Sequence, residues 1–479
     1  MLENLRSLLE DMDMDDVQES SKLCLNSNSG SVKPKSEPGS GTPPGLQCHD
    51  FTKFQPIAIM SAPMIAWVPL VNRIHKFLTS SDYAAQSIDL PSVEIHDVET
   101  APEKRPRTLK HLLRANHVNH AIIYHNLQYH NHMPHLLGSA YLLGADVTQM
   151  QKIYDEESKE LEAWEDSPAE ISDADWRDFL GDKKYQRAYV DFFEDELALK
   201  FNYDWTRVAD EYLFSGKNPL INGVIAGLGH PLIHLGYAYE ISSKEIGMEA
   251  LAMSCTAYNY LHKYIDESSY TKPSSYSTTS PLEILYKIAE DKRFDGLFQD
   301  RGDKNIEDLF YNHENLVLEH WNAWKIVDPN KQFQDSQEAA VALLTRTVKP
   351  GTHAYDFFMV HILTTSHAVR ILLPLIPKRF HISLVRQWWL LTIAVYIAQL
   401  RPNINDDIET KPDKQWNYVE KMAVSGPWAT DAHYVKALRA MKEAAFTWGD
   451  VHERYLAAAV HFADDFKGWT GFGFDEENI

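Results

Sequence analysis

The sequence predicts a mostly α-helical protein, built as a single large helical domain behind a disordered N-terminal tail. Three observations favour this fold class. Long windows place apolar residues at helical spacing, strand-like alternation is scarce, and no Asn-Gly hairpin signal stands between alternating runs. With 44% apolar and 11% aromatic residues, the 479-residue chain can also bury a large core, which excludes disorder of the whole chain.

The first 50 residues differ in composition from the rest of the chain. Residues 20–45 are rich in Ser, Gly, Pro and Lys and have almost no large apolar side chains. Burial cannot offset the entropy lost on ordering such a segment, so we expect residues 1–50 to be disordered and residues 51–479 to form the helical domain. The start of the chain lacks the basic and apolar regions of a secretory signal and is too acidic for a mitochondrial transit peptide. We therefore expect a cytoplasmic protein.

The helical pattern recurs along the domain. Within its first window, Gly144 is expected to break the helix and Asp146 to cap the part that follows. A Ser- and Thr-rich stretch, residues 268–280, is expected to be a surface loop before a helix that begins at Pro281. The best candidate for a strand is residues 92–98. The windows with clear helical spacing are residues 141–161, 185–201, 242–264, 281–289, 314–327 and 433–445.

Charge and motif content exclude several classes of function. Lys and Arg number 46 against 68 Asp and Glu, and a net charge of −22 argues against nucleic-acid or anionic-membrane partners. The apolar run of residues 388–400 is too short to span a bilayer. Three widely spaced cysteines form neither a disulfide framework nor a CxxC zinc site. The sequence also lacks a P-loop, a G-x-G-x-x-G turn and a G-x-S-x-G elbow, so any nicotinamide or flavin would bind without a recognisable Rossmann unit.

Histidine is unusually frequent, at 22 residues, and half of these lie in three segments. Neutral imidazole is the commonest metal ligand and also a near-neutral acid or base. In the first segment His132 and His135 are three residues apart, which places both on one face if a helix begins near Pro134. The alternative is a histidine-rich surface. This segment contains His111, His117, His120, His125, His130, His132 and His135.

Each of the other two segments carries a histidine pair. His230 and His234 are one helical turn apart, although the Glu of a zincin motif is missing. His361 and His367 are six residues apart, so a break near residues 364–366 is needed for both to converge. Buried histidines that are merely hydrogen-bonded are the alternative. Together the three pairs indicate a metal site of the non-haem iron kind, less often zinc, copper or manganese. Its expected ligands are His132, His135, His230, His234, His361 and His367.

Four segments in this order resemble the questin oxidase-like family over roughly residues 55–470: HNHMPHLLGSAYLLGAD, GLGHPLIHLGYAYE, YDFFMVHILTTSHAVRILLP and WWLLTIAVYIAQLRP. The resemblance implies an oxygenase of secondary metabolism that uses O2 to cleave a ring of an anthraquinone-type aromatic polyketide. Members resemble Baeyer–Villiger-type oxygenases or ring-cleaving dioxygenases, with NADPH as a cosubstrate in some. Others look like non-haem iron enzymes, with Fe(II) held by histidines and a carboxylated lysine. Lys378 is the lysine nearest the third segment, with an ordinary surface lysine as the alternative.

Further roles follow from this interpretation. His117 or His130 could act as the catalytic base towards a phenol, because the pKa of imidazole lies near neutral. Five aromatic side chains could stack on a flat substrate, or could simply belong to the core. They are Phe357, Phe358, Trp388, Trp389 and Tyr396. The rival hypotheses are a metal-free, NADPH-dependent Baeyer–Villiger oxidation, a metal-dependent hydrolase or lyase, and a non-enzymatic helical scaffold.

Overall fold

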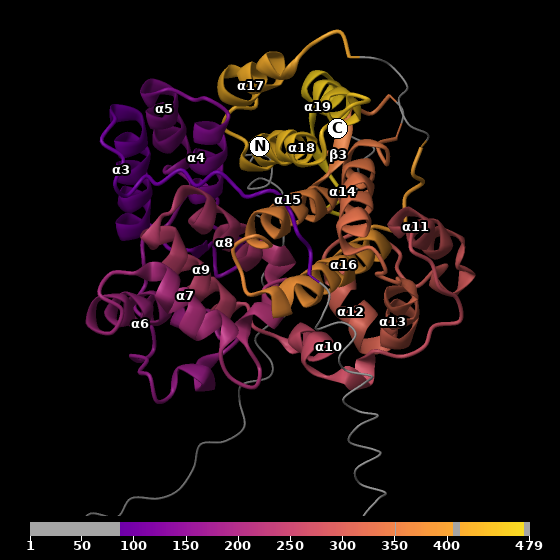
Figure 1. Cartoon of the computed structure of the whole chain (residues 1–479), viewed down its shortest axis with the longest axis horizontal. Coiled ribbons are helices and arrows are strands. Elements are labelled where there is room, and N and C mark those ends of the chain that lie inside the picture. The colour runs from indigo at the N-terminus through magenta and orange to yellow at the C-terminus, as the bar shows by residue number, and fades with distance from the viewer. Residues whose placement is uncertain (1–86, 350, 406–411, 474–479) are drawn as a thin grey trace, which may run out of the picture. The chain divides into compact units, whose positions relative to one another are not determined.

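Helices account for most of the described structure, as the sequence predicts (Figure 1). The computed structural model describes residues 87–349, 351–405 and 412–473. Within these ranges the strands are short and form two two-stranded sheets. Strand β1 (Ile123–Tyr124) pairs antiparallel with β2 (Tyr129–His130), and β3 (Ala354–Asp356) pairs parallel with β4 (Gly468–Thr470). The tail expected at residues 1–50, and the domain start at residue 51, lie outside the described residues.

The N-terminal half of the described chain surrounds two buried helices. Every residue of α8 is buried, as is nearly every residue of α9. A helix that is apolar on all sides needs neighbours all round, and α3, α4, α6, α7 and α15 supply them. In Figure 1 the indigo helices α3, α4 and α5 lie beside this pair. The helices of this half are α3 (Lys104–Asn119), α4 (Met133–Leu142), α5 (Val147–Glu157), α6 (Gln186–Leu199), α7 (Trp205–Phe214), α8 (His230–Ile241) and α9 (Lys244–Thr256).

The C-terminal half is organised around α15 and α16, which lie near the centre of Figure 1. Helix α15 packs against α8, α14, α16 and α18, so it joins the two halves of the chain. The helices of this half are α10 (Lys263–Asp266), α11 (Pro281–Glu290), α12 (Lys304–Asn312), α13 (Glu314–Ala323), α14 (Pro329–Thr345), α15 (Phe357–Leu372), α16 (His381–Ala398), α17 (Trp416–Ser425), α18 (Ala432–Trp448) and α19 (Arg454–Asp465).

Several local predictions are confirmed. Asp146 accepts a hydrogen bond from the backbone of Gln149, whose side chain bonds back to the Asp146 amide, so a capping box starts α5. Gly144 has a φ of +96° between α4 and α5, and α11 begins at Pro281 behind its cap Ser280. Each of the six expected windows contains a helix, although residues 141–161 are divided between α4 and α5, and residues 242–264 between α9 and α10.

The strand expected at residues 92–98 is wrong. This segment is irregular, and its backbone donors reach the C-terminal end of α8 instead of a neighbouring strand. The amides of His96 and Val98 donate to the carbonyls of Glu240 and Ile241, at 2.9 and 3.2 Å. The segment therefore satisfies carbonyls that a helix end leaves without partners.

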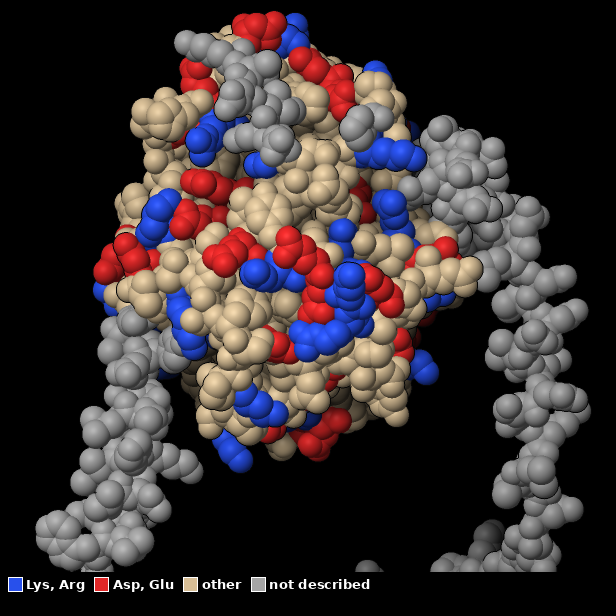
Figure 2. Space-filling view, turned by 90° about the vertical axis from the view of Figure 1, so that its right-hand side faces the viewer, with Lys and Arg blue, Asp and Glu red and all other residues tan. Residues whose placement is uncertain are grey.

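Among the described residues, the stretch Lys378–Ala398, which contains α16, is long and apolar enough to cross a membrane. However, 94% of its apolar window is buried inside the protein, and core helices share these properties. The face in Figure 2 carries Lys and Arg side chains interspersed with Asp and Glu, with no large patch of either sign.

Candidate metal centre

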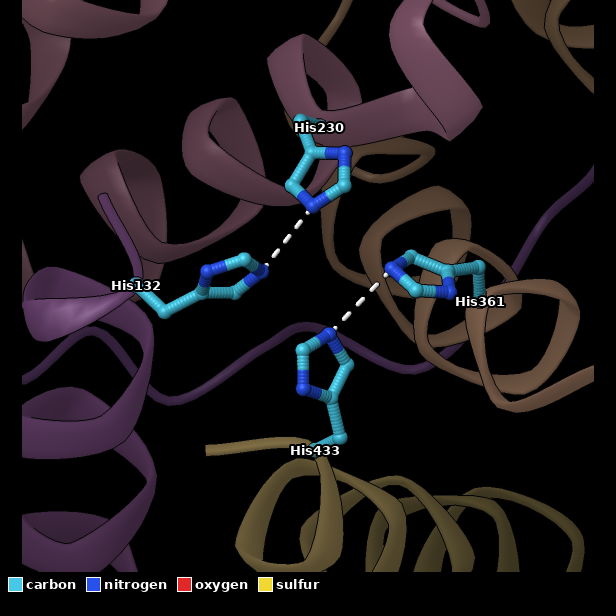
Figure 3. Close-up of side chains that lie close together, drawn as sticks. All are labelled: His132, His230, His361 and His433. Atoms are coloured by element: carbon cyan, nitrogen blue, oxygen red, sulfur yellow. Dashed lines mark hydrogen bonds between the residues drawn. The ribbon is translucent and has the colours of Figure 1, made fainter. Parts of the chain in front are cut away.

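Four imidazole rings from distant parts of the chain meet at one point in the interior: His132, His230, His361 and His433 (Figure 3). One nitrogen of each ring lies within 4.8 Å of the corresponding nitrogen of every other. The Nε2 atoms of His132 and His230 are 2.9 Å apart, and those of His361 and His433 are 3.3 Å apart. Four nitrogen donors around a common centre form a candidate site for a transition metal. We call these four residues the histidine cluster.

All four histidines sit at or near the start of a helix. His132 is the residue before α4, His230 is the first residue of α8, His433 is the second of α18, and His361 lies one turn into α15. The N-terminal end of a helix carries a partial positive charge. Four such ends therefore create a positive potential around the cluster before any metal binds.

Side-chain hydrogen bonds to backbone amides define the first turns of α4, α15 and α18, the helices that carry three of the cluster histidines. Asn131 accepts a hydrogen bond from the Met133 amide at 2.9 Å and donates to the side-chain oxygen of Asn116 at 3.0 Å. Asp356 and Asp431 cap α15 and α18 by accepting hydrogen bonds from backbone amides of the first turn. Each cap fixes the direction in which a helix starts, and with it the direction of the histidine next to it.

Gly229 allows α8 to approach α15 closely. Its φ of +75° is in the left-handed region, and a Cβ placed there would collide with the methyl group of Thr365. The approach of these two backbones brings the ring of His230 within 5.0 Å of the ring of His361, measured between centroids.

Hydrogen bonds to carbonyl groups fix the protonation of two cluster rings. Nδ1 of His230 lies 2.6 Å from the Gly227 carbonyl, and Nδ1 of His361 lies 2.9 Å from the Phe357 carbonyl. A carbonyl can only accept, so both rings carry their proton on Nδ1 and direct the Nε2 lone pair to the centre. Burial, reinforced by nearby positive charge, lowers the pKa of all four rings, that of His361 to about 3. The cluster is therefore neutral, which is the form of imidazole that binds metal.

A buried lysine accompanies the cluster. Lys436 follows His433 by three residues on α18, is fully buried, and its Nζ has no hydrogen-bond partner among the described residues. Burial lowers the pKa of this amine to about 7, against the opposing charge of Asp431. Buried polar groups without partners are rare, so this amine is an unusual feature of the interior next to the cluster. The lysine suggested by the sequence, Lys378, instead has a 71% exposed side chain paired with Asp89 at 3.0 Å. The structure does not place Lys378 at the cluster.

The structure brings three of the six expected ligands together, namely His132, His230 and His361. The other three expected ligands lie outside the cluster. His135 and His234 bond to each other at 2.8 Å in a separate hydrogen-bonded chain. Helix α15 has no break at residues 364–366, so His367 turns away from His361, and its Nε2 lies 3.8 Å from Glu240.

The fourth member, His433, was missed by sequence reasoning. It stands alone in its segment, without a second histidine at helical spacing to draw attention to it. The sequence feature that could have pointed to His433 is its position two residues after the capping residue Asp431, at the start of a window expected to be helical. A histidine in the first turn of a helix is common enough that this signal alone does not indicate a ligand.

The two expected catalytic bases lie outside the cluster as well. His130 stacks on His230 with ring centroids 4.0 Å apart, and burial lowers its pKa to about 3, which makes it a weak base. His117 lies between Glu249 and Glu194, at 2.8 and 3.0 Å. Burial alone would lower the pKa of His117, but these hydrogen bonds raise it to about 10. It is therefore protonated at neutral pH, and an imidazolium cannot accept a further proton.

One of the five expected substrate contacts borders the cluster. The ring of Phe357 lies 4.5 Å from His433 and 5.2 Å from His361 between centroids. Two aromatic rings of the C-terminal segment adjoin it, Phe472 at 5.0 Å and Trp469 at 6.0 Å. These three rings form an aromatic surface beside His361 and His433.

The other expected substrate contacts lie farther from the cluster. Phe358 packs on Phe357 and on Phe472. Trp388, Trp389 and Tyr396 are almost completely buried in α16. The Trp388 indole donates to a backbone carbonyl of α15, and the Tyr396 hydroxyl donates to a backbone carbonyl after α16. These three side chains pack in the core around α16.

Known proteins are similar in sequence to most of this chain. A family model described as questin oxidase-like matches residues 129–441, a range that includes the four cluster histidines and Lys436. The chain is 26% identical to the oxidoreductase AflY of Aspergillus parasiticus over 65% of this chain and 67% of that protein. It is 23% identical to a questin oxidase of Aspergillus terreus and 24% identical to a Baeyer–Villiger oxidase of Emericella nidulans. Each of these two alignments covers 72% of this chain and 82% of the relative.

Proposed function

The chain belongs to the questin oxidase-like family and is an oxidoreductase, and from that premise we propose that it is an oxygenase that opens a ring of an anthraquinone-type aromatic polyketide at a histidine-held iron centre. The observation that carries the proposal is the convergence of four neutral imidazoles on one buried point. The names of the relatives support oxidative chemistry. The sequence resemblance supports the anthraquinone class of substrate.

The donor set fits iron once its charge is considered. Four neutral imidazoles leave the charge of a divalent ion uncompensated, and four helix starts make the surroundings positive. An anionic ligand would balance this charge. The neutral amine of Lys436 can attack the carbon of CO2 and release one proton, which forms a negatively charged carbamate. We assign the metal to the histidine cluster with carboxylated Lys436, in place of the Lys378 that the sequence suggested.

Protein side chains around the cluster would prepare the substrate. A bound iron would supply the one-electron chemistry that allows O2 to react with an aromatic ring. Phe357 offers an aromatic face beside His361 and His433 on which a flat ring can stack. The helix starts around the cluster favour a substrate phenol in its anionic form. His230 and His361 are 4% and 1% exposed, so the point where the four rings meet is shielded from bulk water.

Metal analysis of protein purified without a histidine tag tests the ligand assignment. We expect one iron per chain, and loss of that iron in His361→Ala and in His433→Ala. His320→Ala is the matched control, because His320 is equally buried but bonds Tyr276 and Asp291 outside the cluster. Stoichiometric zinc would instead favour a metal-dependent hydrolase or lyase, and full iron in either cluster variant would refute the assignment.

Oxygen uptake with a hydroxylated anthraquinone, measured with and without NADPH, tests the reaction. We expect uptake that depends on iron and falls at least 100-fold in His361→Ala, because the variant loses a ligand. Lys436→Ala should also lose activity, and removal of CO2 should weaken only the wild type. Uptake by metal-stripped protein that requires NADPH would refute the iron centre and favour a metal-free Baeyer–Villiger oxidation.

A further inference from the structure

A row of hydrogen bonds leads from the side of the histidine cluster towards the protein surface. His135 Nε2 lies 2.8 Å from His234 Nδ1, and His234 Nε2 lies 2.7 Å from Glu249 Oε2. On the other side of this carboxylate, Glu249 Oε1 lies 2.8 Å from His117 Nδ1, and His117 Nε2 lies 3.0 Å from Glu194 Oε1. The five residues come from five helices, α4, α8, α9, α3 and α6. We call them the relay.

Glu249 determines the direction of the hydrogen bonds in the relay. It is 1% exposed, and although burial alone would raise its pKa, hydrogen bonds from His117 and His234 lower it to about 2. An ionised carboxylate can only accept hydrogen bonds. Consequently His234 carries a proton on Nε2 and His117 carries one on Nδ1, and both donate to Glu249.

The inner half of the relay ends in a free lone pair. An arrangement in which His234 carries one proton, on Nε2, leaves its Nδ1 bare, and this Nδ1 then accepts a hydrogen bond from Nε2–H of His135. A neutral imidazole carries a single proton, and in this arrangement His135 uses it on Nε2, so its Nδ1 carries a lone pair. That Nδ1 is buried and has no hydrogen-bond partner among the described residues. The ring it belongs to packs against His132, with centroids 5.4 Å apart.

The outer half of the relay ends in water. The protonated His117 uses Nδ1–H towards Glu249 and therefore directs its second proton, on Nε2, to Glu194. The side chain of Glu194 is 45% exposed, whereas that of His117 is 5% exposed. The relay thus connects an unpartnered acceptor beside the cluster to an exposed carboxylate, with donors that point outward on both sides of Glu249 and one, Nδ1–H of His117, that points inward to it.

A purely structural ion pair does not account for the whole row. His117 and Glu249 alone would satisfy each other's charge, and His234 could be satisfied without a further imidazole behind it. A buried nitrogen lone pair without a hydrogen-bond donor or a metal beside it costs free energy. Its position beside the cluster means that a proton released by a bound substrate would find an acceptor there.

We propose that the relay is a proton path from the reaction site to solvent, with Glu194 as its outlet. The source of the proton, a substrate hydroxyl, rests on the proposed function; the path itself rests on the hydrogen bonds. A proton taken up at His135 Nδ1 displaces the Nε2 proton to His234 Nδ1, and the Nε2 proton of His234 passes to Glu249. The Nε2 proton of His117 then passes to Glu194, which releases it to water.

Atoms and charges balance in this sequence. One proton enters and one leaves, and His135 and His234 end as neutral rings with the opposite nitrogen protonated. Glu249 and His117 change from an ion pair to a neutral pair, so the buried charge does not change. When the ring of His117 turns over and takes the proton from Glu249, the ion pair is restored.

Kinetics of the iron-loaded full chain test the path. We expect Glu194→Gln and His117→Gln to keep their iron content but to turn over at least 10-fold more slowly. Added imidazole, a small diffusible proton carrier, should restore much of this loss. Asp195→Asn changes an exposed carboxylate next to Glu194 that, among the described residues, forms no hydrogen bond or ion pair with the relay, and this variant should match wild type. Unchanged turnover in both relay variants, or a loss that imidazole does not restore, would overturn the proposal.

Neutron diffraction from crystals of the full chain gives a second readout that needs no substrate. We expect hydrogen on Nε2 but not Nδ1 of His135 and of His234, and on both nitrogens of His117. Hydrogen on Nδ1 of His135, or a metal bound to it, would overturn the path. If the expected protons are present but wild type consumes no oxygen with any anthraquinone, the proposed function fails while the path stands.

Discussion

Replacing Lys436 by methionine is expected to make the metal-free protein more stable. In the folded protein the pKa of this buried amine falls from 10.5 to about 7. The unfolded chain therefore binds a proton more tightly than the folded protein does, and protonation favours unfolding. At pH 7 this difference in pKa lowers the free energy of unfolding by roughly 4 kcal/mol. Methionine fills a similar volume without a charge, so the variant should gain most of that free energy.

The pH dependence identifies the cause of the gain. Because the folded protein has the lower pKa, the full loss of unfolding free energy applies below about pH 7. This loss disappears as pH rises towards 10.5, where the amine is neutral in both states. At pH 9.5 the advantage of the variant should shrink to roughly 1.4 kcal/mol. Urea unfolding of chelator-stripped protein in CO2-free buffer, at both pH values, measures this change. Any difference in packing is the same at both pH values and cancels.

Lys378→Met is the matched control, because this lysine is exposed and its pair with Asp89 lies at the surface. Its effect should stay within about 0.5 kcal/mol at either pH. Iron with bicarbonate should in turn stabilise the wild type but not the Lys436 variant. An advantage for the Lys436 variant that is absent, or equal at pH 7 and pH 9.5, would refute the reasoning.

Three further predictions concern the supports of the site. Gly229→Ala should lower the free energy of unfolding by about 2 kcal/mol or more and reduce the iron content, because a side chain there is strained and collides with Thr365. Thermal unfolding and metal analysis of the variant check the two effects. Asp431→Ala should cost about 1 kcal/mol through the lost cap of α18, and an unchanged urea midpoint would contradict this. The stability supplied by His117 and Glu249 should be complete between about pH 4.5 and 6.5, since the pKa of His117 is raised to about 10 and that of Glu249 is lowered to about 2. It should be lost as pH rises towards 10 or falls towards 2, and the difference in unfolding free energy from a double leucine variant measures it.

The sequence predicts the helices well because local interactions determine them. The capping box at Asp146 and the start of α11 at Pro281 involve only residues within one turn, and both are confirmed. The expected strand at residues 92–98 failed for the opposite reason. Its backbone donors find acceptors at the end of α8, about 140 residues away, and no local pattern reveals such a partner.

The same contrast explains the site. Helical spacing correctly placed His230 and His234 on one helix, one turn apart, but did not show which of them joins the cluster. His230 does so because Gly229 brings the start of α8 against α15, whereas His234, one turn deeper, faces the carboxylate of Glu249. Likewise α15 continues without a break, so only His361 of its pair reaches the cluster.

By itself the sequence determined a helical protein with histidines gathered in three segments, because apolar spacing, caps and an excess of imidazoles can all be seen in neighbouring residues. It also carried the resemblance through which the family was expected before the structure was known. Only the tertiary structure decided which nitrogens meet. That choice depends on how closely helices pack and how each is rotated about its axis, and these are set by contacts between residues far apart in the chain. The same contacts bring in His433 and the buried amine of Lys436, and they turn His135 from an expected ligand into the inner end of a hydrogen-bonded chain.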